Sequence, residues 1–298
     1  MTQYVTDGGL ETDLIFHHGV ELPEFASFPL VEDERGRELL TQYFDGYAAV
    51  AARAGAGLML DAPTWRANPD WGAKVGYDAA ALDRVNRAAV ELMHGLREKY
   101  QRELGLTDVK VGGLHGPRGD GYVAGEDADP DEAADYHAAQ ARSAAAAGAE
   151  LVTVLTLTGA GEAIGFVRAV RATGLPVAVG FTVETDGRLP DGTTLGDAIA
   201  RVDAEAPPDY FIVNCAHPTH VAPALEGDGP WSRIEGLRPN ASRMSHAELD
   251  DAPELDEGDP ADLRAGTDRL RERLPSLRIV GGCCGTDSRH VAALWGVG

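Results

Sequence analysis

The chain has 298 residues, enough for one large α/β domain or two smaller ones. Its 48 acidic residues outnumber 26 basic ones, and a net charge of −22 argues against nucleic acid as a partner, because neutralising phosphates requires basic patches. No apolar run approaches the ~20 residues of a membrane span, and the N-terminus has no secretory signal pattern, so we expect no membrane partner and a cytoplasmic location. Such an acidic surface also fits a protein kept soluble at high salt.

Short runs rich in Val, Ile and Leu predict strands, and the segments between them carry apolar residues at helical spacing. In chain order the runs cover residues 3–9, 57–62, 109–114, 151–157, 176–183, 210–215, 233–240 and 278–282. Helical spacing is clear in residues 135–149, 162–174 and 195–206, and Gly or Pro tends to mark the junctions. The run at 233–240 has the weakest strand pattern, and the acidic stretch 245–262 is predicted to be a surface excursion.

This alternation predicts a single α/β domain over residues 1–298, folded as a (β/α)8 TIM-type barrel. Continuous apolar runs are typical of buried parallel strands, and eight strand–helix units match the size of that fold. The alternative is an open doubly wound sheet. Such a sheet usually carries G-x-G-x-x-G after its first strand when it binds dinucleotides, whereas the first run here ends in "TDGGLETDL".

Only three cysteines occur, and two of them are adjacent. Cys215 ends the sixth run, and Cys283 and Cys284 follow the eighth in "RIVGGCCGT". Functional residues of such barrels collect at the C-terminal ends of the strands. Neighbouring side chains on a regular strand point to opposite faces, so we expect the flanking glycines to let both sulfurs aim at one point. Three thiolates there would suit Zn²⁺ with one open coordination position, which is typical of a catalytic site.

Other interpretations of these cysteines stay open at this point. The vicinal pair could be an inert core pair or a redox pair. Histidines such as His115 and His217 could serve as ligands, although three thiolates already suffice. An open zinc position could hold a thiol substrate, whose thiolate is the nucleophile, or a water molecule, as in a zinc hydrolase. No base is evident beside the cysteines, which favours the thiol.

Several segments are similar to patterns of one known family. The segment "DGGLETDL" (7–14) resembles DGG-x-GT-x-L, and "GGLHGPRGD" (112–120) resembles GS-x-GP-x-G. "TDGRLPDGTTL" (185–195) looks like the stretch after that family's fifth strand, and "VNCAHP" (213–218) and "GGCCGT" (281–286) resemble its two metal-ligand segments. These patterns belong to the homocysteine S-methyltransferases, zinc-dependent (β/α)8 barrels that methylate a thiol. The chain resembles this family nearly from end to end.

The resemblance implies that the three cysteines bind Zn²⁺ and carry the catalysis. It implies substrate-binding roles for a further set of residues: Asp7, Gly8, Gly9, Asn214 and Trp65. Asn214 would orient the metal site, or would only satisfy backbone groups. Trp65 would form a substrate wall or a cation–π face for a sulfonium donor, or would be an ordinary rim aromatic.

The implied partners are a small-molecule thiol acceptor and a methyl donor. The reaction would move a methyl group from S-methylmethionine or S-adenosylmethionine to homocysteine, as in methionine biosynthesis, and a chain of this length favours such a direct donor over a corrinoid. One position departs from the family, which usually has Glu-Thr at the end of the fourth strand, where the carboxylate anchors the amino group of homocysteine. Here the segment has Leu155 and Thr156. A leucine cannot pair with an ammonium group, and burying that group unpaired costs several kcal/mol.

Three interpretations of this departure remain open. Another carboxylate could replace the missing one. The acceptor could be a different thiol, without an amino group at that position. The protein could also be a family member that binds zinc or thiols without turnover. No sequence pattern indicates an oligomeric state.

Overall fold

Parallel strands close into a barrel in the computed structural model, which describes residues 2–123, 125 and 128–298. Within the described residues the strands are β1 (Tyr4–Val5), β2 (Gly57–Asp61), β3 (Val109–His115), β4 (Leu151–Leu157), β5 (Val177–Phe181), β6 (Tyr210–Asn214), β7 (Ile234–Arg238) and β8 (Ile279–Val280). Each strand pairs with the next in the sequence, and β8 pairs with β1, so the sheet has no free edge. The predicted single-domain α/β barrel is therefore confirmed, including the strand with the weakest sequence pattern.

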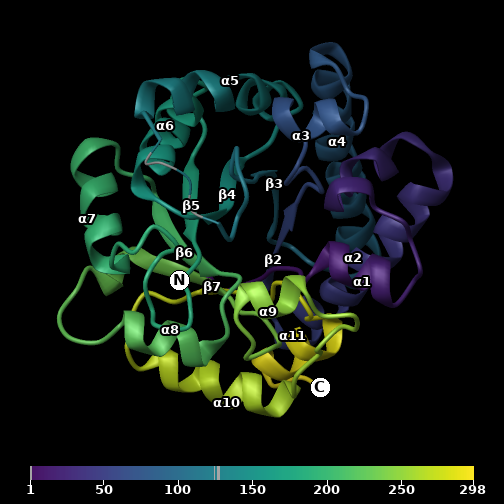
Figure 1. The fold of residues 1–298 in the computed structure, drawn as a ribbon. Coiled ribbons are helices and arrows are strands. Elements are labelled where there is room, and N and C mark those ends of the chain that lie inside the picture. Colours follow the sequence, from purple (N-terminus) through teal and green to yellow (C-terminus); the bar gives the residue numbers. More distant parts are fainter. Residues whose placement is uncertain (1, 124, 126–127) are drawn as a thin grey trace.

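Helices surround the barrel, as Figure 1 shows. They are α1 (Leu10–Phe16), α2 (Glu34–Ala54), α3 (Pro69–Lys74), α4 (Ala79–Leu104), α5 (Pro130–Ala146), α6 (Ala160–Arg171), α7 (Leu195–Glu205), α8 (Pro218–Ala224), α9 (His246–Asp250), α10 (Pro260–Arg271) and α11 (Ser288–Trp295). Short 3₁₀ helices are η1 (Pro23–Phe25), η2 (Phe28–Glu32) and η3 (Trp231–Arg233). In the described part of the chain, no helix combines the length and the apolar character needed to cross a membrane.

The long helices begin and end at residues suited to those positions. The Asp33 carboxylate accepts a hydrogen bond from the Gly36 N–H at the start of α2, and the Asp78 carboxylate accepts one from the Ala81 N–H at the start of α4. Gly55 ends α2 with a φ of 63°, a left-handed conformation that costs glycine little. These caps fix where α2 and α4 begin and where α2 ends.

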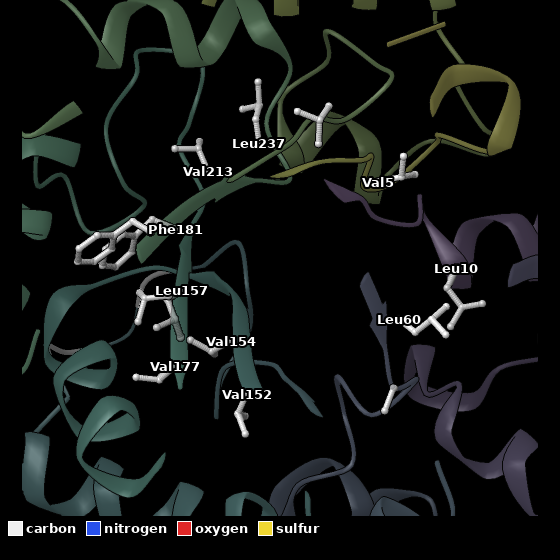
Figure 2. Packing of buried hydrophobic residues seen from close by; sticks show 14 of the residues in the cluster. Val5, Leu10, Leu60, Val152, Val154, Leu157, Val177, Phe181, Val213 and Leu237 are labelled. Atoms are coloured by element: carbon white, nitrogen blue, oxygen red, sulfur yellow. The ribbon is translucent and has the colours of Figure 1, made fainter. Parts of the chain in front are cut away.

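In most strands, alternate side chains belong to two separate cores. One set points outward and packs against the helices; Figure 2 labels Val5, Leu10, Leu60, Val152, Val154, Leu157, Val177, Phe181, Val213 and Leu237 of this core. A smaller cluster, drawn from alternating strand positions, fills the barrel interior: Tyr4, Met59, Leu151, Leu155, Ala178, Tyr210, Ile212 and Ile279. Because both faces of the strands are buried, the strand sequences are continuous apolar runs rather than alternating ones.

The end of β4 is irregular, and this shapes the barrel mouth. Its register with β5 shifts by one residue between Val154 and Leu157, and Thr156 has a φ of 69°. The Asn214 side chain reaches over from β6 to hold this bulge: its Oδ1 accepts a hydrogen bond from the Thr156 N–H (3.0 Å), and its amide donates to Thr156 Oγ1 (2.8 Å). A Cβ on Gly180 of β5 would lie 2.7 Å from Asn214 Oδ1, so only glycine leaves this path open.

The stretch 245–262 is only partly the surface excursion that the sequence predicts. Glu254 is exposed, but His246 in α9 is buried and lies at the barrel mouth. Its Nε2 donates to the carbonyl oxygen of Cys215 (2.6 Å), and its Nδ1 lies 2.7 Å from Glu184 Oε1. Acidic composition alone did not indicate that one histidine anchors this stretch to the strand ends.

We expect Phe181→Ala to lower the free energy of unfolding by about 3–5 kcal/mol, because it leaves a cavity in the outer core. The ring of Phe181 is fully buried and stacks on Phe211 of the neighbouring strand, with ring centroids 6.1 Å apart. Phe16→Ala is the matched control, since Phe16 is 46% exposed and its loss should change stability by less than about 0.5 kcal/mol. Equal shifts of the two urea-unfolding midpoints would contradict this account of the core.

Candidate active site

The three cysteines meet at the C-terminal mouth of the barrel. Cys215 directly follows β6, and Cys283 and Cys284 lie in the loop after β8. Their sulfur atoms all lie within 4.8 Å of one another, and 3.6 Å separates Cys215 Sγ from Cys284 Sγ. All three are free thiols. The structure thus brings together the side chains that the sequence analysis selected as metal ligands.

The spacing of the sulfurs suits a tetrahedral metal ion. Bonds of about 2.3 Å from zinc to sulfur would place two sulfurs about 3.8 Å apart in a tetrahedron. The observed 3.6 Å between the Cys215 and Cys284 sulfurs is close to that value. Across the residues that the structure describes, no other set of three or more His, Cys, Asp or Glu side chains is arranged to hold an ion, so His115 and His217 are not part of such a group. The donor set therefore fits a thiophilic divalent ion with one position left for another ligand.

Hydrogen bonds hold Cys215 in an uncommon backbone conformation. Its φ is 58°, in the left-handed region that residues other than Gly, Asn and Asp rarely adopt. Its N–H donates to the Arg238 carbonyl (3.0 Å), and its own carbonyl accepts from Asn240 Nδ2 (3.1 Å), Thr182 Oγ1 and His246 Nε2. The surroundings thus over-determine a strained residue, a feature that clusters at functional sites. This turn directs the Cys215 side chain to the cavity.

The glycines around the vicinal pair provide space as well as conformational freedom. Gly285 has a φ of 76°, whereas a Cβ on Gly282 would lie 2.0 Å from Thr286 Oγ1. A Cβ on Gly9, from the segment after β1, would lie 2.7 Å from the carbonyl oxygen of Cys283. At Gly9 and Gly282, a side chain would clash with neighbouring atoms. The glycines therefore allow the segment after β1 and the loop after β8 to pack closely, in addition to permitting the turn.

The three thiols do not titrate alike. The pKa of Cys283 lies well below its usual value, because Cys215 and Cys284 donate hydrogen bonds to its sulfur and the Arg238 guanidinium favours the thiolate. The pKa of Cys215 is correspondingly raised by its hydrogen bond to Cys283 and by burial. The cluster therefore favours one thiolate before any cation enters, which is a suitable starting point for metal binding.

A cavity opens beside the cysteines and has apolar walls with a few charged groups. Phe25, Trp65, Leu114 and Leu155 are among its apolar lining residues. Its charged lining residues are Asp7, Glu11, Asp61 and Arg238, and the three cysteines and Tyr122 complete the side facing the barrel axis. Convergent polar groups in an apolar pocket are the usual form of a small-molecule site.

Four of the five residues predicted to bind substrate line this cavity: Asp7, Gly8, Gly9 and Trp65. Trp65 donates from its indole Nε1 to the Leu155 carbonyl (3.3 Å), which fixes the ring as a wall. Asn214 is fully buried, and its side-chain hydrogen bonds run to Thr156. Its contacts are those of a positioning residue, and a role toward substrate stays a prediction.

Arg238 is a site residue that the sequence analysis missed. It is 4% exposed, and its guanidinium pairs with Asp7 and with Asp61 Oδ2 (3.0 Å), while Nε donates to the Gly282 carbonyl (3.0 Å). Tyr43 also donates to Asp7 Oδ2 (3.2 Å). Burial raises the pKa of Asp61 to about 6, although Arg238 opposes this. A buried arginine needs carboxylate partners, but the sequence alone does not show that this arginine is buried or which carboxylates pair with it.

Two further lining residues were missed. Glu11 lies in the first turn of α1, and burial raises the pKa of its carboxyl to about 7. The signal was its place in "DGGLETDL", where the family pattern has glycine. Tyr122 follows β3, and its hydroxyl lies 3.0 Å from Cys215 Sγ and 3.6 Å from Cys284 Sγ. Its ring packs on His246 at 4.3 Å, so the phenol sits on the cavity side of the sulfurs. No local pattern distinguishes this tyrosine from others in loops.

Fold and site together define a class: a (β/α)8 barrel with a three-thiol centre that opens into a cavity at the strand ends. The model of the homocysteine S-methyltransferase family matches residues 4–296, and the chain belongs to this family of methyltransferases.

Solved structures of one bacterial enzyme have the same fold. The homocysteine methyltransferase MmuM from Escherichia coli in its metallated form has a TM-score of 0.75 and 22% identity, covering 100% of this chain and 97% of that one. Its oxidized form has a TM-score of 0.76 and 21% identity, with coverage of 99% and 96%. No curated protein matches the sequence. At these identities, the similarity to the MmuM structures shows a common fold. The match to the family model is what shows that the chain belongs to the family.

We expect Arg238→Met to cost about 3–5 kcal/mol of stability at neutral pH, because it leaves two buried carboxylates without their counter-ion. Burial raises the pKa of Asp7 and Asp61 above their unfolded values. The loss of unfolding free energy in the variant should therefore become smaller as the pH falls and both carboxyls protonate. Arg278→Met is the control: Arg278 pairs with the partly exposed Glu235, and its loss should cost about 1 kcal/mol or less. Urea unfolding at several pH values measures both, and a deficit that is independent of pH would contradict this origin.

Proposed function

We propose that the protein is a zinc-dependent S-methyltransferase that transfers a methyl group from a small onium donor to the thiol of homocysteine. The convergence of Cys215, Cys283 and Cys284 on a mostly apolar cavity carries this proposal. Membership of the homocysteine S-methyltransferase family supports the acceptor, and the fold that the chain has in common with the metallated MmuM supports a metal at this place.

Zinc bound by the three thiolates would supply Lewis-acid stabilisation of the acceptor thiolate, which is the nucleophile, at neutral pH. The residues of the chain have the other tasks. The apolar walls would exclude water. Acceptor and donor together would need this cavity and the adjoining one, which shares Phe25, Trp65 and Cys284 with it, and an in-line arrangement there would give the rate gain from proximity. Trp65 and Phe25 are the aromatic residues of the cavity wall, and the Arg66 guanidinium already lies over both rings, so a sulfonium cation would have to contact their other faces.

The transfer itself needs no general acid. A bond forms between the acceptor sulfur and the methyl carbon while the bond from that carbon to the sulfonium sulfur breaks. The electron pair stays on the departing sulfur, which leaves as a neutral thioether, and the proton of the acceptor thiol has already been lost. S-Methylmethionine and S-adenosylmethionine both satisfy this chemistry.

The protein should bind one zinc ion and transfer methyl groups, and Cys215→Ser should abolish both, because it removes one of three thiolate ligands. Metal analysis of the zinc-loaded protein measures the first effect. Production of methionine from L-homocysteine, with each donor in turn, measures the second. Circular dichroism confirms that the variant is folded. Methyl transfer by metal-free Cys215→Ser at the wild-type rate would overturn the proposal. Zinc binding without transfer from either donor would favour the alternative of a non-catalytic zinc- or thiol-binding protein.

Asn214→Ala should weaken zinc binding by about 10–100-fold, the usual effect of removing a group that orients a ligand. Asn214 precedes Cys215 and ties it to the bulge of β4 at Thr156. The matched control is Asn86→Ala, because Asn86 is buried in α4 and donates to the Ala67 and Leu82 carbonyls. Competition with a chelator gives the zinc affinities. An equal loss of affinity in both variants would mean that Asn214 acts only through overall stability.

A further inference from the structure

The cavity contains a carboxyl group that the thiol cluster and the Arg238 network leave unused. Glu11 lines the cavity from the first turn of α1, and Ser27 Oγ donates to its Oε1 (2.7 Å). Among the described residues, no Lys, Arg or His forms an ion pair with Glu11. The Glu11 carboxyl is partly buried, and Arg66 acts on it only through a charge interaction beyond ion-pair distance, so it can still accept the cationic group of a ligand.

The position of Glu11 relative to the cysteines is fixed by the backbone. The Gly9 N–H donates to the Thr286 carbonyl (3.0 Å), and the Gly285 N–H donates to Thr12 Oγ1 (3.1 Å). These bonds fasten the first turn of α1 to the loop that carries Cys283 and Cys284. Glu11 and the cysteines therefore line one cavity from two segments that hydrogen bonds hold together.

The other carboxylates of the cavity are committed elsewhere. Asp7 accepts from Arg238 and from Tyr43. Asp61 shares Arg238, although its second oxygen, Oδ1, has no hydrogen-bond partner in the part of the chain that the structure describes. Arg238 thus neutralises one of these two charges, and Glu11 is the lining carboxylate that has no arginine of its own.

Leu155 occupies the wall where the family has its ammonium-binding glutamate, and it lines the same cavity as Glu11. Conversely, Glu11 stands where the family pattern DGG-x-GT-x-L has glycine. In this cavity the β4 position therefore carries an apolar side chain, and a carboxyl group lies on α1.

We propose that Glu11 binds the ammonium group of the acceptor amino thiol. The side chain at position 155 is a leucine and cannot bind this group. This inference rests on the proposed function, because it assumes that an amino thiol enters with its sulfur toward the cysteines. Asp61 Oδ1, on the β2 side, lacks a hydrogen-bond partner among the described residues but is itself buried, so it adds negative charge near the ammonium group without contacting it directly. An amino thiol would then lie with its charged end toward α1 and β2, away from the apolar end of β4.

Calorimetric titration without a methyl donor tests the proposal independently of turnover. The zinc-loaded wild type and Glu11→Gln are titrated with L-homocysteine and with 4-mercaptobutyrate, which is the same skeleton without the amino group. The wild type should bind homocysteine more tightly, and Glu11→Gln should weaken homocysteine binding by about 10–100-fold, the range for a hydrogen bond to a charged group, with little change for 4-mercaptobutyrate. Glu11→Asp should recover part of the preference.

Glu98→Gln is the control, since it removes the same charge from an exposed position of α4 that lines neither cavity beside the cysteines. Metal analysis confirms equal zinc content in all variants. The inference is overturned if Glu11→Gln retains the homocysteine preference, or if it weakens the binding of both thiols equally. Loss of the preference in a protein that shows no methyl transfer would support Glu11 as the ammonium site while refuting the proposed function.

Discussion

The buried ion pairs of Arg238 hold the barrel mouth in one arrangement. Its side chain starts from β7 and bonds to Asp7 after β1, to Asp61 of β2 and to the Gly282 carbonyl after β8. Its backbone carbonyl accepts the N–H of Cys215 after β6. Taking these charges out of water is offset only when all partners are in place. The cysteines and the segment that leads into α1 are therefore all connected to one residue, Arg238.

A second constraint acts on the opposite wall. Thr156 and Cys215 both have positive φ values, and the Asn214 side chain joins them across β5. Strained residues of this kind persist only where the surroundings over-determine them. The bulge decides which way Leu155 faces, while the hydrogen bonds at Cys215 decide where its sulfur lies. The apolar wall and the metal ligand are thus linked, and the polar end of the cavity is left to the α1 side.

The barrel could be predicted because burial on both faces imposes continuous apolar runs, and even 233–240 formed its strand. The cysteines could be predicted because sulfur at two strand ends has few other uses. Arg238 could not be separated from other arginines, since its meaning depends on Asp7 and Asp61, which are 231 and 177 residues away in the chain. Tyr122 lies in a loop and His246 begins the short helix α9, and their approach to Cys215 depends on how these segments fold back over the strand ends.

The sequence by itself determined the architecture, the family and the three thiols, because each is encoded locally, in apolar runs, glycine frames and motifs a few residues long. The tertiary structure alone decided which charges face the thiols. Residues near 7, 61, 155, 215, 238 and 284 become neighbours only when the strands close into a barrel. Burial then gives each carboxylate its character: Asp7 and Asp61 are tied to an arginine, and Glu11 is left facing the cavity. Charge pairing depends on distance in space, which no short stretch of sequence contains.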